Sequence, residues 1–199
     1  GNGSEVAKVE LTNLAIAFQD HPTRHARESL RRLSEHVCNQ PIGDRTFHAK
    51  ALQTTARVTR TDDASWLITL VETTPWWDVR INAAAALATI PDESVPAALT
   101  KAIDREQLYF VRHGLEAARA RAHESLFRVR LQEMRARLTG EDWLAAQAVI
   151  VKLLDDTEGH KHIPSTMKLR WQTDCHLLLS EISKEQGEDD ASLKHLRRV

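Results

Sequence analysis

The sequence predicts an all-α protein, an α-solenoid of about ten helices packed in antiparallel pairs. Two observations support this prediction. Glycine and proline are scarce, at 7 and 6 of 199 residues, whereas alanine, leucine, arginine and glutamate, all good helix formers, are abundant. Apolar residues also recur at the three- and four-residue spacing of amphipathic helices, and this pattern repeats along the chain.

The bulk composition is that of an ordinary soluble protein, with 42% hydrophobic and 28% charged residues. The formal net charge of -1 excludes a global field that would attract nucleic acid. Two cysteines, Cys38 and Cys175, indicate no disulfide framework, so a cytoplasmic location is expected. No apolar run suggests membrane insertion. Because the sequence begins GNGSE, a periplasmic or exported location and an origin in a larger protein stay open.

The repeat has a period of 32 residues. The pair Val79–Arg80 returns as Val111–Arg112, and Leu67 returns as Leu99, each 32 positions later. One period holds two helices, each with an apolar stripe on one side. Helices are expected over 63–73, 78–90, 93–103 and 108–122. The helix over 78–90 is expected to bury Val79, Ala83, Ala86, Leu87 and Ile90.

Helix ends are marked by proline and aspartate. Pro75 and Pro91 bracket the helix over 78–90, since proline cannot continue a helix interior. Asp78 is expected to cap the start of this helix, and Asp92 the start of the next.

The second helix of the period resembles that of a HEAT-like repeat of the phycobilisome-lyase type. The motif is Asp78-Val79-Arg80-x-x-Ala83-Ala84-x-Ala86-Leu87-x-x-Ile90. The resemblance covers about 24–122, with a degenerate unit over 46–60 preceded by a helix over 24–38. In such repeats the arginine joins a ladder of polar contacts. The resemblance therefore implies a structural role for the repeat positions Val79, Arg80, Ala83, Leu87, Val111 and Arg112.

The last third of the chain changes character. Helices are expected over 124–138, 141–156, 165–185 and 188–197. The stretch KLRWQTDCHLLLSEISKEQGEDDASLKHLRR resembles a tetratricopeptide repeat. It departs from that pattern at Ser183, where an aromatic residue is usual, and in the long loop over 157–166. The expected organisation is a tail or first helix over 1–20, HEAT-like repeats over 21–122 and tetratricopeptide-like repeats over 123–199, compatible with one continuous solenoid.

Trp76 and Trp77 suggest an aromatic site that could bind a ligand. The stretch Trp76-Trp77-Asp78 resembles a tryptophan-rich stretch of HEAT-like alkylpurine DNA glycosylases, whose catalytic aspartate would fall at Ile81. Isoleucine cannot supply the carboxylate, so glycosylase chemistry is not expected. Two interpretations remain for the tryptophans: packing between repeats, or contact with a partner.

Arginines are concentrated between residues 105 and 137. This stretch contains eight arginines, four glutamates and no aspartate. They form either a basic face that binds phosphates or an acidic partner, or a solvated helix surface with ion pairs. The candidate partner-binding residues are Trp76, Trp77, Arg119, Arg128, Arg130 and Arg135.

No catalytic, cofactor or metal site is expected. His160 and His162 lie near Cys175 and His176 in the sequence, but their spacing matches no zinc pattern. Cys38 and Cys175 are expected to be small buried residues rather than nucleophiles.

The sequence therefore predicts a non-enzymatic helical-repeat scaffold or adaptor that binds a protein or peptide, as a module of a larger protein or complex. The alternative is a nucleic-acid-binding solenoid that uses the arginine-rich 105–137 face without glycosylase activity. A third interpretation is a non-catalytic arm of a multidomain NTPase or an exported enzyme.

Overall fold

The computed structural model describes residues 64–140, 142–159 and 161–198, together with Glu28 and Arg32. Within these residues the chain forms seven helices and no strand, so the all-α prediction is confirmed. The chain divides into two compact units, with the boundary between Ala122 and His123. Each unit is described by itself.

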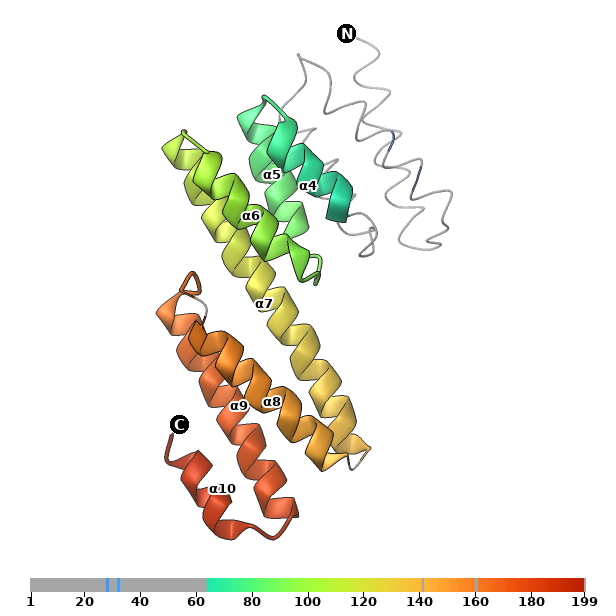
Figure 1. Ribbon diagram of the computed structural model, residues 1–199, viewed down its shortest axis with the longest axis vertical. Helices are drawn as coiled ribbons and strands as arrows, with labels where there is room; N and C mark the ends of the chain where they lie inside the picture. The colour runs from blue at the N-terminus through green and yellow to red at the C-terminus, as the bar shows by residue number, and fades with distance from the viewer. Residues whose placement is uncertain (1–27, 29–31, 33–63, 141, 160, 199) are drawn as a thin grey trace, which may run out of the picture. The chain divides into compact units, whose positions relative to one another are not determined.

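The first unit is built from α4 (Ala64–Thr73), α5 (Trp77–Leu87), α6 (Ser94–Arg105) and the first part of α7 (Tyr109–Thr139) (Figure 1). The helix α4 packs against both α5 and α6. Short connections at 74–76 and 88–93 join these helices. Their apolar faces enclose one core, and partly buried Trp66, Ile68, Trp77 and Ile81 pack against it.

The 32-residue period is visible in the burial of this core. Leu67 and Leu99 are fully buried, and so are Val79 and Val111. Small side chains let helices approach closely, which explains the alanine run of α5. The predicted buried face of the helix over 78–90 is confirmed: Val79, Ala83, Ala86, Leu87 and Ile90 are all buried.

The two predicted caps have different outcomes. Asp92 accepts hydrogen bonds from the Ser94 amide at 2.8 Å and from the Ser94 hydroxyl at 2.6 Å, so it satisfies a donor at the start of α6. The prediction for Asp78 was wrong. The residue at the start of α5 is Trp76, whose extended backbone precedes the helix, and Asp78 lies within the first turn. There its negative charge still interacts favourably with the helix dipole.

The most evident departure from prediction is α7. Separate helices were expected over 108–122 and 124–138, but Tyr109–Thr139 is one helix of 31 residues. The junction contains Ala122 and His123 and has neither glycine nor proline, so the backbone has no reason to leave the helical conformation. Gly140 follows the end of α7, as expected of a glycine stop.

The second unit contains the rest of α7, α8 (Trp143–Gly159), α9 (Ser165–Glu185) and α10 (Asp189–Leu196). The helix α9 packs against both α8 and α10. The prediction of a helix over 165–185 is confirmed. The helix α8 runs to Gly159, so the loop predicted over 157–166 is shorter than expected. Gly187 takes φ 77°, which glycine adopts without strain, and turns the chain into α10.

The second core is separate from the first. Its buried residues are Phe127, Met134, Ala146, Ile150, Leu153, Ile163, Trp171, Cys175, Leu178, Leu179 and Ile182. No residue belongs to both cores.

Some predictions fall outside the described residues. These are the segment 1–20, most of the helix over 24–38, the helix over 46–60 and Cys38. Within the first of these helices, Glu28 and Arg32 form an ion pair of 2.8 Å one helical turn apart. The solenoid and the count of about ten helices stay predictions.

Candidate interaction surface

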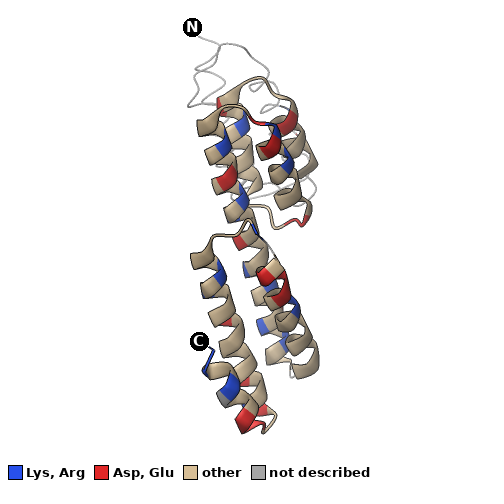
Figure 2. Ribbon diagram, turned by 60° about the vertical axis from the view of Figure 1, so that its left-hand side comes forward, with Lys and Arg blue, Asp and Glu red and all other residues tan. Residues whose placement is uncertain are grey.

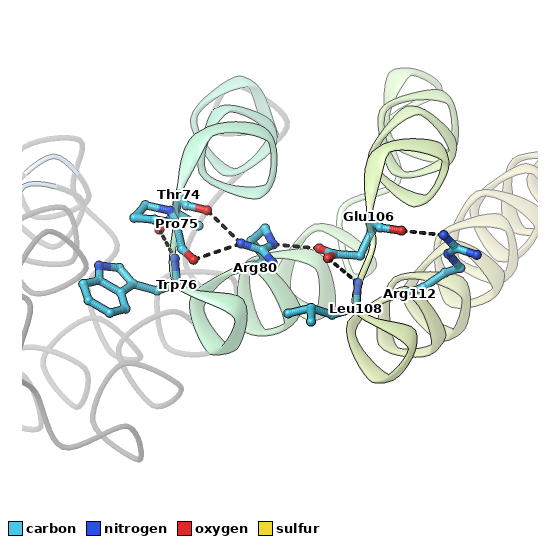
Figure 3. A network of polar contacts seen from close by, with 7 residues as sticks. All are labelled: Thr74, Pro75, Trp76, Arg80, Glu106, Leu108 and Arg112. Atoms are coloured by element: carbon cyan, nitrogen blue, oxygen red, sulfur yellow. Dashed lines mark hydrogen bonds and ion pairs between the residues drawn. The ribbon is translucent and has the colours of Figure 1, made fainter.

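A polar network connects the helix-to-helix turns of successive repeats in the first unit (Figure 3). Arg80 on α5 donates through Nη1 to the carbonyl oxygens of Thr74 and Pro75, at 3.0 and 3.1 Å. Its Nε forms an ion pair with Glu106 Oε2 at 2.9 Å, just beyond the end of α6. The other carboxylate oxygen of Glu106 accepts the Leu108 amide at 3.0 Å. The Glu106 side chain is only 8% exposed, so these donors replace most of its water.

The network repeats with the period of the sequence. Arg112, 32 positions after Arg80, donates to the Glu106 carbonyl oxygen, as Arg80 does to that of Thr74, 32 positions before Glu106. Figure 3 shows Glu106 between the two arginines. Both arginines therefore bond a backbone carbonyl oxygen of the turn that precedes their own helix.

Large apolar side chains are exposed beside this network. Leu108, Tyr109 and Phe110 are 42%, 82% and 50% exposed at the start of α7, and Trp76 is 40% exposed at the start of α5. Trp77 is half-buried and meets Phe110 edge-to-face, with ring centroids 5.0 Å apart. We call the exposed set Trp76, Leu108, Tyr109 and Phe110 the aromatic surface. Of the two predicted tryptophans, Trp77 packs against the core and Trp76 is exposed.

An open pocket of about 390 Å³ adjoins the aromatic surface through Leu108. Its apolar lining comes from Val71, Ala102 and Leu115, each at least nine-tenths buried. The remaining lining residues are Glu72, Thr74, Arg80, Arg105, Glu106, Gln107 and Leu108. The pocket therefore lies at the ends of α4 and α6, where the chain turns into the next helix.

Ile81 packs inside the first unit rather than at a reactive site. A methyl group built on Gly114 of α7 would come within 3.3 Å of Ile81 Cγ1, so the two helices touch there.

The predicted arginines lie in different surroundings. Arg119 is buried beneath the surface, donates to Thr100 Oγ1 at 3.3 Å, and has a pKa lowered mainly by that burial. Arg130 pairs with Asp156 at 2.8 Å, and Arg128 with Glu124 at 3.1 Å. Arg135 is exposed. The four are thus not one uniform basic face, and Figure 2 shows acidic and basic residues interspersed along the helices of each unit.

The second unit has its own polar cluster around Glu124 of α7. Arg170 Nη2 donates to both carboxylate oxygens, at 2.6 Å to Oε2, and Trp171 Nε1 donates to Oε2 at 3.0 Å. Trp171 also stacks on Phe127, with ring centroids 4.6 Å apart and planes 6° apart. Glu124 thereby fixes the N-terminal half of α9 against α7.

Two histidines meet between α9 and α10. The rings of His176 and His195 have centroids 5.7 Å apart, and both Nδ1 atoms are buried without a hydrogen-bond partner. Burial lowers the pKa of both groups, and the charges of Arg198 and Lys194 lower that of His195 further. Beside them Ser180 and Ser192 share a hydrogen bond of 2.9 Å.

Cys175 is fully buried, and burial raises the pKa of its thiol to about 12. The thiolate needed for nucleophilic attack is therefore suppressed, and the prediction of a small buried residue is confirmed. His162 is exposed in the connection between α8 and α9, and His160 lies outside the described residues. No group of three or more metal-binding side chains occurs in the described part of the chain.

No family model, curated protein or solved structure matches the chain. Among residues 64–140, 142–159 and 161–198, no helix is long and apolar enough to span a membrane. The geometry above is thus the basis for any functional argument.

Sequence analysis singled out Trp76 but missed Leu108, Tyr109 and Phe110. A signal was present, because Leu108 and Tyr109 lie 32 positions after Trp76 and Trp77. Large apolar residues thus recur at the start of the second helix in both repeats. The period shows where these residues recur, but their exposure depends on which neighbouring helices cover them.

Proposed function

We propose that the chain is a non-enzymatic helical-repeat adaptor that binds a protein partner through the aromatic surface. In this proposal the first unit consists of HEAT-like repeats, the second resembles tetratricopeptide repeats, and together they form an α-solenoid. The observation that supports it most is the exposure of Tyr109, Phe110, Leu108 and Trp76 at the turns of successive repeats. Tryptophan and tyrosine are enriched among the residues that dominate interface energies.

Rigid support also favours binding through this surface. Leu108 follows Glu106, whose carboxylate holds the Leu108 amide and is itself held by Arg80. Phe110 rests edge-on against Trp77. Side chains positioned in this way lose less conformational entropy on binding than mobile ones.

The nucleic-acid alternative receives less support. Arg130 is paired with Asp156, Arg119 is buried, and Arg128 shares the Glu124 carboxylate with Arg170. A paired or buried arginine releases few counterions, so Arg119 and Arg130 contribute little to phosphate binding. The alternative nevertheless predicts a distinct result, which is binding to DNA or RNA that weakens steeply with salt.

Site-specific photo-crosslinking tests the proposal. A benzophenone amino acid replaces Tyr109 in one variant and exposed Glu133 of α7 in the matched control. We expect a discrete protein adduct from position 109 that is lost when Phe110→Ala and Trp76→Ala are added, and no such adduct from position 133. Equal labelling from both positions would contradict the proposal. So would retention of a labelled 20-nucleotide DNA or RNA as the only ligand bound.

A further inference from the structure

The charged residues that line the pocket beside the aromatic surface are two glutamates and two arginines. Three of its four charged lining residues are in ion pairs: Arg80 with Glu106, and Glu72 with Lys101 at 2.7 Å. The fourth, Arg105, is exposed and forms no ion pair with any residue that the structure describes. Its charge acts on the pocket, since it helps lower the pKa of Glu72 behind the larger effect of the Lys101 hydrogen bond.

Two carboxylates lie near Arg105 without forming an ion pair with it: Glu72, whose pKa it helps lower, and Asp104, which precedes it. Arg112 donates to a neutral carbonyl oxygen, that of Glu106, and so adds positive charge close to Leu108. Four basic and three acidic side chains thus surround the pocket, which leaves one positive charge in excess at its rim. Its floor of Val71, Ala102 and Leu115 is apolar.

We propose that this pocket binds an acidic segment of the partner protein that carries a large apolar side chain. A carboxylate of the segment faces Arg105, and the apolar side chain enters between Val71, Ala102 and Leu115, beside exposed Leu108. The volume of about 390 Å³ is near the low end of the range for ligand pockets and accommodates one or two side chains rather than a large cofactor. This inference rests on the proposed adaptor function and specifies its partner.

Charge complementarity is what selects this occupant. A basic segment would bring like charge to Arg105 and Arg112, which costs binding energy at an interface. A purely apolar segment would cover Arg105 without pairing it, and a charge removed from water without a partner is costly. An acidic segment avoids both costs.

A displayed peptide library tests the inference on the full chain. Random ten-residue peptides on yeast are sorted separately against the wild-type chain, Arg105→Glu and Arg197→Glu. Arg197 is an exposed arginine of the second unit, so it controls for the change in net charge. Circular dichroism of each variant verifies that it folds. A peptide enriched on wild type is then synthesised, and its affinity for all three chains is measured by fluorescence anisotropy.

We expect wild type and Arg197→Glu to enrich Asp and Glu next to Leu, Phe or Trp, and Arg105→Glu to enrich Lys and Arg instead. The synthesised acidic peptide should bind Arg105→Glu at least tenfold more weakly than wild type. A Leu108→Ala variant should lose affinity for the peptide while keeping the acidic preference. These results together would establish the acidic partner.

Other outcomes separate this inference from the adaptor function. Apolar peptides without acidic bias, unaffected by Arg105→Glu, would overturn the acidic partner and leave the adaptor proposal in place. Absence of enrichment on wild type, together with absence of a crosslink from position 109, would overturn both. Sedimentation velocity is the last measurement. A dimer that Arg105→Glu abolishes would show that the pocket binds a second copy of the chain, and it would overturn the acidic segment of a partner protein.

Discussion

At the scale of single residues, Arg80 joins the turn that precedes α5 to the turn that follows α6. Its guanidinium bonds two carbonyl oxygens of the turn before α5 and the carboxylate after α6. The planar guanidinium suits such a role, because it presents several donors in fixed directions. A lysine would offer one compact charge and could not reach all three acceptors in the same geometry.

Arg80→Ala should lower the free energy of unfolding of the first unit by about 2 to 3 kcal/mol. The reason is that Glu106, whose side chain is 8% exposed, would keep its charge but lose its cation. Urea unfolding followed by circular dichroism measures the effect. Lys101→Ala is the matched control, because the Lys101–Glu72 pair is more exposed and should contribute less than about 1 kcal/mol.

A double-mutant cycle identifies the source of that loss. In the double variant Arg80→Ala with Glu106→Gln, the glutamine side chain keeps an oxygen that accepts the hydrogen bond of the Leu108 amide. It carries no charge. The double variant should therefore lose less stability than the two single changes added together. Strict additivity would show that Arg80 acts through the carbonyl oxygens alone.

The sequence predicted Arg80 as a structural position through its resemblance to HEAT-like repeats, but it did not predict Glu106. The partner of Arg80 could not be found from the period, because Thr74 occupies the equivalent place one repeat earlier. A carboxylate that occurs in only one period cannot be recognised by comparing equivalent positions. The same reason applies to Arg105, which corresponds to Thr73 one period earlier. The sequence marked Arg105 only as one member of the arginine-rich stretch over 105–137.

At the scale of helices, α10 contacts α9 through two histidines whose protonation should weaken the contact. The His176 and His195 rings meet with unpartnered nitrogens, and the charged groups that act on them are Arg198, Lys194 and Glu158. Both pKa values are lowered, so the unfolded chain binds protons more readily than the folded one. The contact therefore stabilises α10 fully above about pH 6.5, the unfolded value, and weakens as the pH falls below it.

Acidification from pH 7.5 to 5.5 should accordingly speed amide hydrogen exchange in α10 and in the facing turns of α9. Exchange rates must be corrected for their intrinsic pH dependence. His195→Gln removes one titrating ring and should reduce this pH effect, whereas His162→Gln, at an exposed position, should leave it unchanged. A pH effect of equal size in all three chains would rule out the histidine pair as its cause.

The contact between α7 and α9 depends on Glu124. Glu124→Ala should destabilise the second unit by about 1 to 2 kcal/mol, because Trp171 Nε1 would lose its acceptor in a largely buried place. Quenching of tryptophan fluorescence during urea unfolding gives the midpoint. Glu133→Ala, on an exposed part of the same helix, provides the baseline and should shift that midpoint very little.

Helix positions were predicted best where the sequence contains its own stop signals. The prolines near α5 and the Gln186–Gly187 turn gave boundaries close to those observed. The single long α7 was missed because the repeat pattern suggested a break near residue 123 that the backbone does not need. The histidine contact was missed because its members lie on two helices joined by a turn, and no local pattern brings them together.

At the scale of the whole molecule, the chain has two hydrophobic cores that share no residue. Each unit buries its own apolar surface, so each has its own source of stability. The boundary after Ala122 lies inside α7, which both units use. Equilibrium unfolding of such a chain is not expected to be a single two-state transition.

Core truncations test this independence. Leu99→Ala removes a fully buried side chain from the first core, and Ile150→Ala does so in the second; each should cost about 2 to 5 kcal/mol. Hydrogen exchange measured across a urea series reports α4–α6 and α8–α10 separately. Leu99→Ala should lower the midpoint of α4–α6 and leave that of α8–α10 within error, and Ile150→Ala should do the reverse. Equal shifts of both midpoints would show that the two cores unfold as one cooperative unit.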